Sequence, residues 1–442
     1  MPDSTGDQRA AQRAALQESL RATTRIEAKG EPKIGIDEFM SVCERFGLSR
    51  SALAQIRAVV EKEDWGAGPF LANYYSNLSE TKVQAYERAA REIFGVDYAI
   101  AVSSGTGALH AAMVGVGVKA GAEVICPAIG FFATANTVAL CGGTPVFCDV
   151  DESLHMDPAK IEPLVTSRTV AVAPTCVMGG IYDIGAIMEV AGKHGLKVVE
   201  DCAQSCGATY KGKYAGAFGD YGCFSISAYK VVGGGEGGLL LAKTEELWER
   251  ASQVIECGGL WRPDRFAPSR YEGELFPGTN YRMSELEAAV DVVQLGKMPA
   301  AVARFRTAKR RILERLERFR EIAPQRSNDP GGEVGYTLRF FPETRELSEL
   351  IVEGLQAAQL NASTRGKQGA PDWHIYSYMY PLQDQCRIHR GDCPIADEFF
   401  DRMVSVGVNQ WYTEDDCLHV AERINTVLGK YCTPDANAKP WL

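Results

Sequence analysis

Long apolar runs, paired cysteines and an excess of positive charge are all missing from this sequence of 442 residues. No run of about 18 uncharged apolar residues occurs, so we expect no membrane-spanning helix. The first 30 residues also lack the apolar segment of a secretory signal. The formal net charge of -10 argues against a nucleic-acid-binding protein, which requires a basic face.

Cysteine occurs thirteen times, but no two cysteines form a CxxC pair. Cys202 and Cys206, or Cys386 and Cys393, are the nearest candidates for metal ligands, and they lack the close paired spacing of zinc sites. We therefore expect no metal. Several cysteines lie inside apolar runs, where a free thiol behaves as a small hydrophobic side chain. Free thiols in this number are typical of a reducing compartment, so we expect a cytoplasmic protein.

The length and composition predict an ordinary globular protein of about two domains. Residues 1–30 are rich in Gln, Arg, Ala and Glu and are expected to form a flexible N-terminal extension. Residues 31–300 are expected to hold two short N-terminal helices followed by a large domain. A long basic amphipathic helix over residues 301–322 leads into a small C-terminal domain, residues 301–442.

Short apolar strands alternate with helices through the large domain. We predict strands at 98–104, 123–129, 144–150, 169–177, 196–202, 220–227 and 237–243. The predicted helices between them cover 105–118, 131–142, 157–165 and 184–195. This order is typical of the α/β class, with a mostly parallel sheet covered by helices on both faces. Ligands of such sheets bind beyond the carboxyl ends of the strands.

A lysine and an aspartate are the residues most suited to chemistry. Lys230 stands in "FSISAYKVVGGGEGG", among small, aromatic and glycine residues. A partly buried lysine has a lowered pKa and becomes a nucleophile toward carbonyls, whereas most lysines are surface residues. Asp201 ends the apolar run "LKVVED" and needs a cationic partner there, either a neighbouring side chain or a protonated pyridine nitrogen.

Two further stretches follow predicted strands. "SSGTGAL", residues 103–109, opens a helix whose N–H groups suit an anion. Phe131 in "PAIGFFATAN" is placed either to pack on a cofactor ring or to fill the core. The glycines between Gly115 and Gly121 imitate a dinucleotide fingerprint, but they precede a strand instead of following one.

Taken in order, five stretches resemble the DegT/DnrJ/EryC1/StrS aminotransferases, which use pyridoxal phosphate (PLP). They are "SSGTGAL", "PAIGFFATAN", "VVEDCAQSCGA", "FSISAYKVVGGGEGG" and "GTNYRMSELEAA". The resemblance spans residues 31–310 and, more weakly, the remainder. It implies fold type I, the aspartate-aminotransferase-like fold, with a large PLP-binding domain and a smaller C-terminal α/β domain. It also implies amino transfer from glutamate or glutamine to a keto-sugar or keto-cyclitol.

The same resemblance implies roles for individual residues. Lys230 would form the internal aldimine and carry the proton in catalysis, and Asp201 would bind the pyridine nitrogen. Gln204 would contact the ring hydroxyl, and Phe131 would stack on the ring. The residues implied to bind phosphate are Gly105, Thr106 and Ser225, together with Asn280, which would reach the cofactor of the neighbouring subunit in a homodimer.

The acceptor region departs from the usual family pattern. Cys176 stands where many relatives have histidine, and Ala122 replaces the aspartate of "GDEV". "PDWHIYSYMYPL" resembles the branch that aminates free higher sugars such as 8-amino-octulosonate. We name four candidate substrate contacts, each of which also suits core packing: Trp373, His374, Trp411 and Tyr412.

Three other functions are weighed against this one. A pyridoxamine-dependent sugar dehydratase of the same fold would typically carry histidine in place of Lys230. A non-catalytic regulator of the same fold would be expected to have lost Lys230 or Asp201, and both are present. A nicotinamide-dependent dehydrogenase would need a glycine fingerprint after its first strand, with an acidic residue about 20 positions later.

Overall fold

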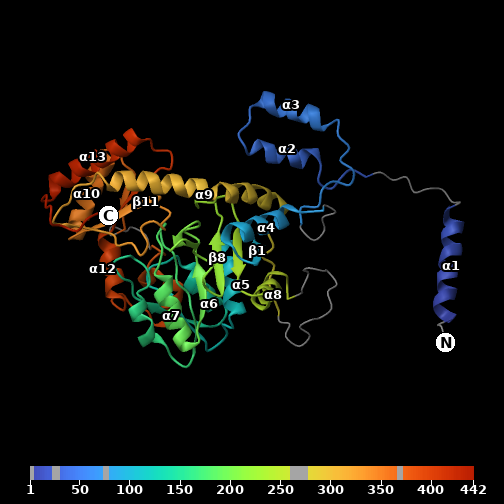
Figure 1. Ribbon diagram of the computed structural model, residues 1–442. Helices are drawn as coiled ribbons and strands as arrows, with labels where there is room; N and C mark the ends of the chain where they lie inside the picture. Colours follow the sequence, from blue (N-terminus) through green and yellow to red (C-terminus); the bar gives the residue numbers. More distant parts are fainter. Residues whose placement is uncertain (1–3, 22–29, 73–78, 259–276, 366–371) are drawn as a thin grey trace. The chain divides into compact units, whose positions relative to one another are not determined.

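The computed structural model describes residues 4–21, 30–72, 79–258, 277–365 and 372–442, and it divides into two units (Figure 1). The first unit, Met1–Phe70, holds the helices α1 (Ser4–Arg21), α2 (Ile36–Glu44) and α3 (Arg50–Val60). Ser49 caps α3 by accepting a hydrogen bond from the N–H of Ala52. No helix in the described part of the chain is long and apolar enough to cross a membrane.

The second unit, Leu71–Leu442, is built on a seven-stranded sheet. Its order is β1 (Tyr98–Val102), β9 (Gly238–Ala242), β8 (Tyr221–Ser225), β5 (Lys197–Asp201), β4 (Thr169–Val172), β2 (Glu123–Pro127) and β3 (Thr144–Cys148). β9 runs antiparallel to both of its neighbours, and the other strand pairs are parallel. The predicted mostly parallel α/β sheet is therefore confirmed.

Helices cover both faces of this sheet, as Figure 1 shows. They are α4 (Lys82–Phe94), α5 (Gly105–Gly115), α6 (Ala133–Leu140), α7 (Ile184–His194) and α8 (Glu245–Ile255). Successive residues of β9 belong to different core clusters, with Leu240 in one and Leu239 and Leu241 in the other. Side chains of a strand alternate between faces, so the strand is buried on both sides. This explains why the strands are continuous apolar runs in the sequence.

A smaller antiparallel sheet follows, in the order β10 (Ile322–Pro324), β11 (Thr337–Pro342), β13 (Val404–Gly407) and β12 (Ala362–Thr364). It packs with α10 (Arg345–Ala357) and α13 (Glu414–Tyr431) around a third core cluster. The shorter elements are β6 (Thr209–Tyr210), β7 (Lys213–Tyr214), α11 (Tyr380–Cys386) and α12 (Pro394–Arg402). The long helix α9 (Glu285–Leu313) passes from α4 to α13 (Figure 1).

Two predicted helices differ from the structure. Residues 157–165 form two short 3-10 turns, Pro158–Lys160 and Glu162–Leu164, because Pro163 lacks the N–H that a helix continuing from Pro158 would need. The helix predicted over 301–322 is part of α9, which begins at the Ser284 cap and ends at Leu313. α9 contains Pro299 in its interior and still continues for fourteen more residues, so this proline does not end the helix.

Candidate active site

Lys230 lies in a tight loop between β8 and β9 whose base is closed by main-chain hydrogen bonds. The N–H of Ile226 donates to Gly237 O at 2.9 Å, and the N–H of Gly234 donates to Ile226 O at 3.0 Å. Gly235 has a φ of 138°, a conformation that side chains other than glycine rarely adopt. The glycine run therefore lets the chain return to β9 directly behind the lysine.

The side chain of Lys230 is half-buried and lines a cavity of about 740 Å³. Burial lowers the pKa of the Lys230 ammonium, while the nearby carboxylate of Asp201 acts in the opposite direction. A lowered pKa increases the fraction of neutral, nucleophilic amine at neutral pH. The structure thus brings the two predicted residues within electrostatic reach of one another.

Asp201 is buried at the carboxyl end of β5. Its Oδ2 accepts a hydrogen bond of 2.5 Å from Thr134 Oγ1, and its Oδ1 accepts one of 3.0 Å from the N–H of Ala203. Burial raises the pKa of Asp201, and the hydrogen bond from Thr134 acts to lower it. Among the described residues, no cationic side chain hydrogen-bonds to this carboxylate. It is therefore suited to a cationic group supplied by a ligand.

The start of α5 meets the end of β8 at the predicted phosphate site. A Cβ added to Gly105 would lie 2.7 Å from the Cβ of Ser225, so only glycine allows this approach. Ser104 caps α5 through a hydrogen bond from the N–H of Gly107 at 3.0 Å. The first N–H groups of a helix have no partner inside it, which includes those of Gly105 and Thr106. Together with the Ser225 hydroxyl they suit an anion.

Gln204 also lines the cavity, and only one of its two side-chain polar atoms has a hydrogen-bond partner in the described part of the chain. Its Oε1 accepts a hydrogen bond of 2.9 Å from the N–H of Met178. Its Nε2 is buried and has no partner among the described residues. A buried donor without a partner costs about 1–3 kcal/mol, so a ligand oxygen at this position would be stabilising. The donor at Gln204 and the acceptor at Asp201 therefore suit a ligand that offers an oxygen to the first and a cationic N–H to the second.

Phe131 and His374 lie opposite each other near the cavity. Their ring centroids are 5.3 Å apart, and the N–H of Gly130 donates to His374 O at 2.9 Å. His374 Nδ1 lies 2.8 Å from the carboxylate of Asp372, which also contacts Arg365. Burial alone would raise the pKa of Asp372, but His374 and Arg365 lower it to about 2.

The four candidate substrate residues divide into two pairs. His374 and Tyr412 line the cavity. Trp373 packs on the ring of Phe132 at 4.6 Å, and Trp411 lies under the guanidinium of Arg304 at 4.2 Å. Neither tryptophan lines the cavity.

Sequence reasoning missed several residues of the site. Thr134 lies within the quoted stretch "PAIGFFATAN", yet nothing in the sequence indicates that its hydroxyl reaches Asp201. The small domain contributes further polar lining residues: Thr337, Asn361, Ser363, Arg365, Asn409 and Gln410. They come from separate strands and loops that share no sequence motif.

Asn280 stands apart from this cavity and is exposed. Its Oδ1 accepts a hydrogen bond of 3.2 Å from the N–H of Arg282. Because its side chain faces solvent in a single chain, the predicted contact with a second subunit stays a prediction.

Comparison with known proteins places this geometry in a family. The sequence model of the DegT/DnrJ/EryC1/StrS aminotransferase family matches residues 72–425. The chain is 39% identical over 346 residues to a GDP-perosamine synthase of Caulobacter vibrioides, covering 78% of this chain and 89% of that protein. It is 31% identical over 339 residues to an L-glutamine:2-deoxy-scyllo-inosose aminotransferase of Streptoalloteichus tenebrarius, covering 75% of this chain and 77% of that protein.

A solved structure gives the same match at the level of the fold. The aminotransferase from Psychrobacter cryohalolentis superposes with a TM-score of 0.70 at 25% identity. The alignment covers 87% of this chain and 98% of that one. The likeness therefore extends over the large sheet and the C-terminal domain together.

Proposed function

The chain belongs to the DegT/DnrJ/EryC1/StrS aminotransferase family, and from this premise we propose that the cavity beside Lys230 is its active site. The protein is a PLP-dependent aminotransferase of fold type I. The observation that supports this site is a half-buried lysine whose pKa burial lowers, within electrostatic reach of a buried aspartate. PLP supplies an aldehyde that bonds to amines and a ring that stores the electron pair released at the donor's alpha carbon.

Lys230 has two tasks in this proposal. Its amine would hold the cofactor in place between turnovers, and the same nitrogen would accept and return the proton of the donor's alpha carbon. Both tasks need the neutral amine, which the lowered pKa favours at neutral pH. The closed loop base at Ile226 and Gly234 keeps the nitrogen in position.

Asp201 holds the ring nitrogen protonated, and Thr134 orients the carboxylate for this task. A cation beside Asp201 favours its charged form, which reverses the effect of burial on its pKa. The unpaired Nε2 of Gln204 would donate to the ring hydroxyl, and Phe131 would pack against the ring. Gly105, Thr106 and Ser225 hold the phosphate through N–H and hydroxyl groups.

The acceptor is proposed to be a keto-sugar or a keto-cyclitol. The wall of the active-site cavity carries amide, hydroxyl and guanidinium groups from the small domain, among them those of Asn361, Ser363 and Arg365. Such groups can hydrogen-bond to a molecule rich in hydroxyls. One relative is named for the product GDP-perosamine, and the other is named for amino transfer between L-glutamine and 2-deoxy-scyllo-inosose. His374 and Tyr412 are proposed substrate contacts. Glutamate or glutamine is the proposed donor.

The proposed active unit is a homodimer in which Asn280 of each chain reaches the cofactor phosphate of the other. The exposure of Asn280 in a single chain supports this arrangement. A phosphate bound at a subunit interface would make cofactor binding depend on dimer formation.

The proposal is tested with the Lys230→Ala variant and an acceptor panel. The PLP-loaded parent should absorb near about 410–430 nm and lose this band when glutamate or glutamine is added. The aminated enzyme should regain it with a keto-sugar or keto-cyclitol. Lys230→Ala should bind PLP without turnover, whereas the control Lys243→Ala, at an exposed lysine after β9, should retain activity. Full transamination by Lys230→Ala would refute the assignment.

A further inference from the structure

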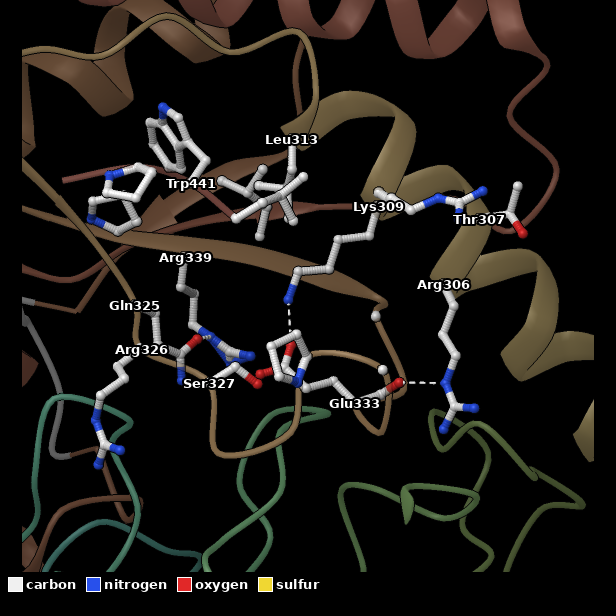
Figure 2. A pocket seen from close by; sticks show the side chains of 18 residues that line it. Arg306, Thr307, Lys309, Leu313, Gln325, Arg326, Ser327, Glu333, Arg339 and Trp441 are labelled. Carbon is white, nitrogen blue, oxygen red and sulfur yellow. Dashed lines mark hydrogen bonds and ion pairs between the residues drawn. The ribbon is translucent and has the colours of Figure 1, made fainter. Parts of the chain in front are cut away.

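A second cavity, of about 530 Å³, lies along α9 and β11 (Figure 2). It shares no lining residue with the active-site cavity. Neighbouring residues of one strand serve the two spaces, with Thr337 in the active-site lining and Leu338 and Arg339 in the second lining. The function proposed above gives this second cavity no role.

The lining carries more positive than negative charge. Five cationic side chains line it, against one carboxylate side chain, that of Glu333; the five are Arg306, Lys309, Arg310, Arg326 and Arg339. Lys309 pairs with Glu333 at 2.5 Å (Figure 2). Arg326 and Arg310 pair with Asp151 and Glu314 outside the lining. The other two cations, Arg306 and Arg339, have a different kind of hydrogen-bond partner.

Both of these guanidinium groups hydrogen-bond to neutral oxygens. Arg306 donates to Glu333 O at 2.7 Å and to Gly332 O at 2.9 Å. Arg339 is buried and donates to Met178 O at 2.6 Å and to Gln325 Oε1 at 3.0 Å. Burial lowers the pKa of both arginines, with Glu333 acting in the opposite direction. Neither guanidinium hydrogen-bonds to a carboxylate in the described part of the chain, so the positive charge of each can still attract an anion.

Part of the remaining wall is apolar. Leu313 and Trp441 lie together on one side of the cavity, and the Lys309 amine and Arg339 lie beyond them (Figure 2). Trp441 is fixed by a hydrogen bond from its Nε1 to Glu317 O at 2.8 Å and by an edge contact with Phe340 at 5.6 Å. An occupant would thus meet an aromatic face at one end and cations at the other.

We propose that this cavity is a binding site for a small organic anion, with one phosphate or carboxylate group on an apolar body. Its volume lies within the range of about 300–1,000 Å³ that is usual for small-molecule sites. A guanidinium can form two parallel hydrogen bonds to either a phosphate or a carboxylate, so the site suits both kinds of anion. A built-in aromatic wall adds selectivity for ligands that carry a ring or an alkyl group.

A bound anion would lie close to the catalytic machinery. Arg339 holds the carbonyl of Met178, and the N–H of Met178 donates to Gln204 Oε1 at 2.9 Å. Met178 has a φ of 52°, so its conformation depends on such contacts. The occupant would therefore touch a guanidinium that is two hydrogen bonds from Gln204.

Isothermal titration of the PLP-loaded full-length protein with phenyl phosphate, phenylacetate and inorganic phosphate tests the site. Phenyl phosphate or phenylacetate should bind once per chain, and the tighter of the two identifies the preferred anion. Arg310→Glu reverses an exposed charge in the lining and should weaken binding about fivefold or more at low salt. Arg345→Glu is the matched control, because Arg345 is also exposed and also pairs four residues along its helix.

A second variant tests the apolar wall. Trp441→Ala should weaken phenyl phosphate about tenfold and leave inorganic phosphate unchanged, because the inorganic ion does not use the ring. Absence of binding by both phenyl compounds up to about 10 mM would overturn the proposal. Equal affinities in the parent, Arg310→Glu and Trp441→Ala proteins would overturn it as well, since the ligand would then be bound elsewhere.

Discussion

Asp201 is a buried carboxylate that is held in place by hydrogen bonds but has no cationic side chain bonded to it in the described part of the chain. It lies at the end of β5 with hydrogen bonds from Thr134 and Ala203, and its pKa is raised by burial. Another carboxylate of the same strand, Glu200, is fully paired by Tyr182 and the N–H groups of residues 216, 218 and 219. Glu200 therefore has a structural task, whereas Asp201 retains acceptor capacity for a cofactor.

The role of Thr134 leads to a prediction about catalysis. Thr134→Val removes a hydrogen bond to a charged group, worth about 1.5–3 kcal/mol, and should lower kcat about ten- to hundredfold. Loss of this bond should also raise the pKa of Asp201 further, so the pH profile of kcat should change shape. Thr137→Val is the control, because Thr137 is buried in the same helix but bonds to Thr134 O. Equal losses in both variants would contradict the proposed role.

Asp291 leads to a prediction about stability. Its carboxylate is buried beside Gly234 and has no hydrogen-bond partner among the described residues. Burial raises its pKa to about 7, and Glu287 adds to the effect. The protonated form is favoured in the folded state, so the contribution to stability is present below about pH 4 and is lost as the pH rises through 7.

Asp291→Ala should therefore be more stable than the parent at pH 8 by about 1–2 kcal/mol. The gain should shrink or vanish at pH 4–5, where the parent carries the proton. Urea unfolding at the two pH values measures it. A variant that is less stable than the parent at pH 8 would contradict this account, because the ionised carboxylate would then not destabilise the folded protein.

At the residue scale, the sequence could indicate only those site residues that a local sequence pattern marks. Lys230 and Asp201 could be proposed from the sequence because a glycine run and a strand end mark them, and their role in catalysis stays a prediction. Thr134 was not found, since its contact depends on which side of α6 faces β5. Asn361 and Arg365 were not found because they reach the cavity from a different sheet.

At the scale of elements, α4 and α9 are joined by one buried side chain. Glu285, in the first turn of α9, accepts hydrogen bonds from the N–H groups of Lys82 at 2.7 Å and Val83 at 3.2 Å. These are the first two residues of α4, whose N–H groups have no partner inside the helix. The negative charge of Glu285 at the N-terminus of α4 also interacts favourably with the dipole of that helix.

Glu285→Ala should consequently lower the free energy of unfolding by about 1.5–3 kcal/mol. Glu346→Ala is the control, since Glu346 lies in the first turn of α10 but is exposed, and its cost should be below about 0.5 kcal/mol. Chemical denaturation measures both variants. Similar values for the two would show that Glu285 does not support α4.

The strands were predicted more successfully than the helix ends. A strand buried on both faces appears in the sequence as an apolar run, so each run marks one strand of the large sheet. The beginning of α9 was missed by sixteen residues because its first turns pack against α4 and lack the basic residues of its later part. The two 3-10 turns before β4 show that prolines, more than apolar spacing, decided that segment.

At the scale of the whole molecule, the family match and the domain division are consistent. The match begins at residue 72, next to the boundary between the units Met1–Phe70 and Leu71–Leu442. Our division into an extension of residues 1–30, a large domain to residue 300 and a small domain over 301–442 stays a prediction.

The proposed homodimer predicts complementation between inactive chains. Lys230→Ala and Asn280→Ala proteins should each have little activity, because every site lacks one essential group. Unfolding and refolding them together forms mixed dimers with one intact site, so roughly a quarter of parental activity should return. No recovery, with mixed dimers demonstrated by mass spectrometry, would contradict a shared site.

The most direct test of the central claim locates the bond between protein and cofactor. The PLP-loaded protein is reduced with borohydride and digested, and the modified peptide is sequenced by mass spectrometry. We expect the pyridoxyl group on Lys230 in the parent, and an Asp201→Asn variant should carry it on the same lysine with weaker cofactor affinity. A pyridoxyl group on another lysine, or a protein that PLP does not modify, would contradict the account.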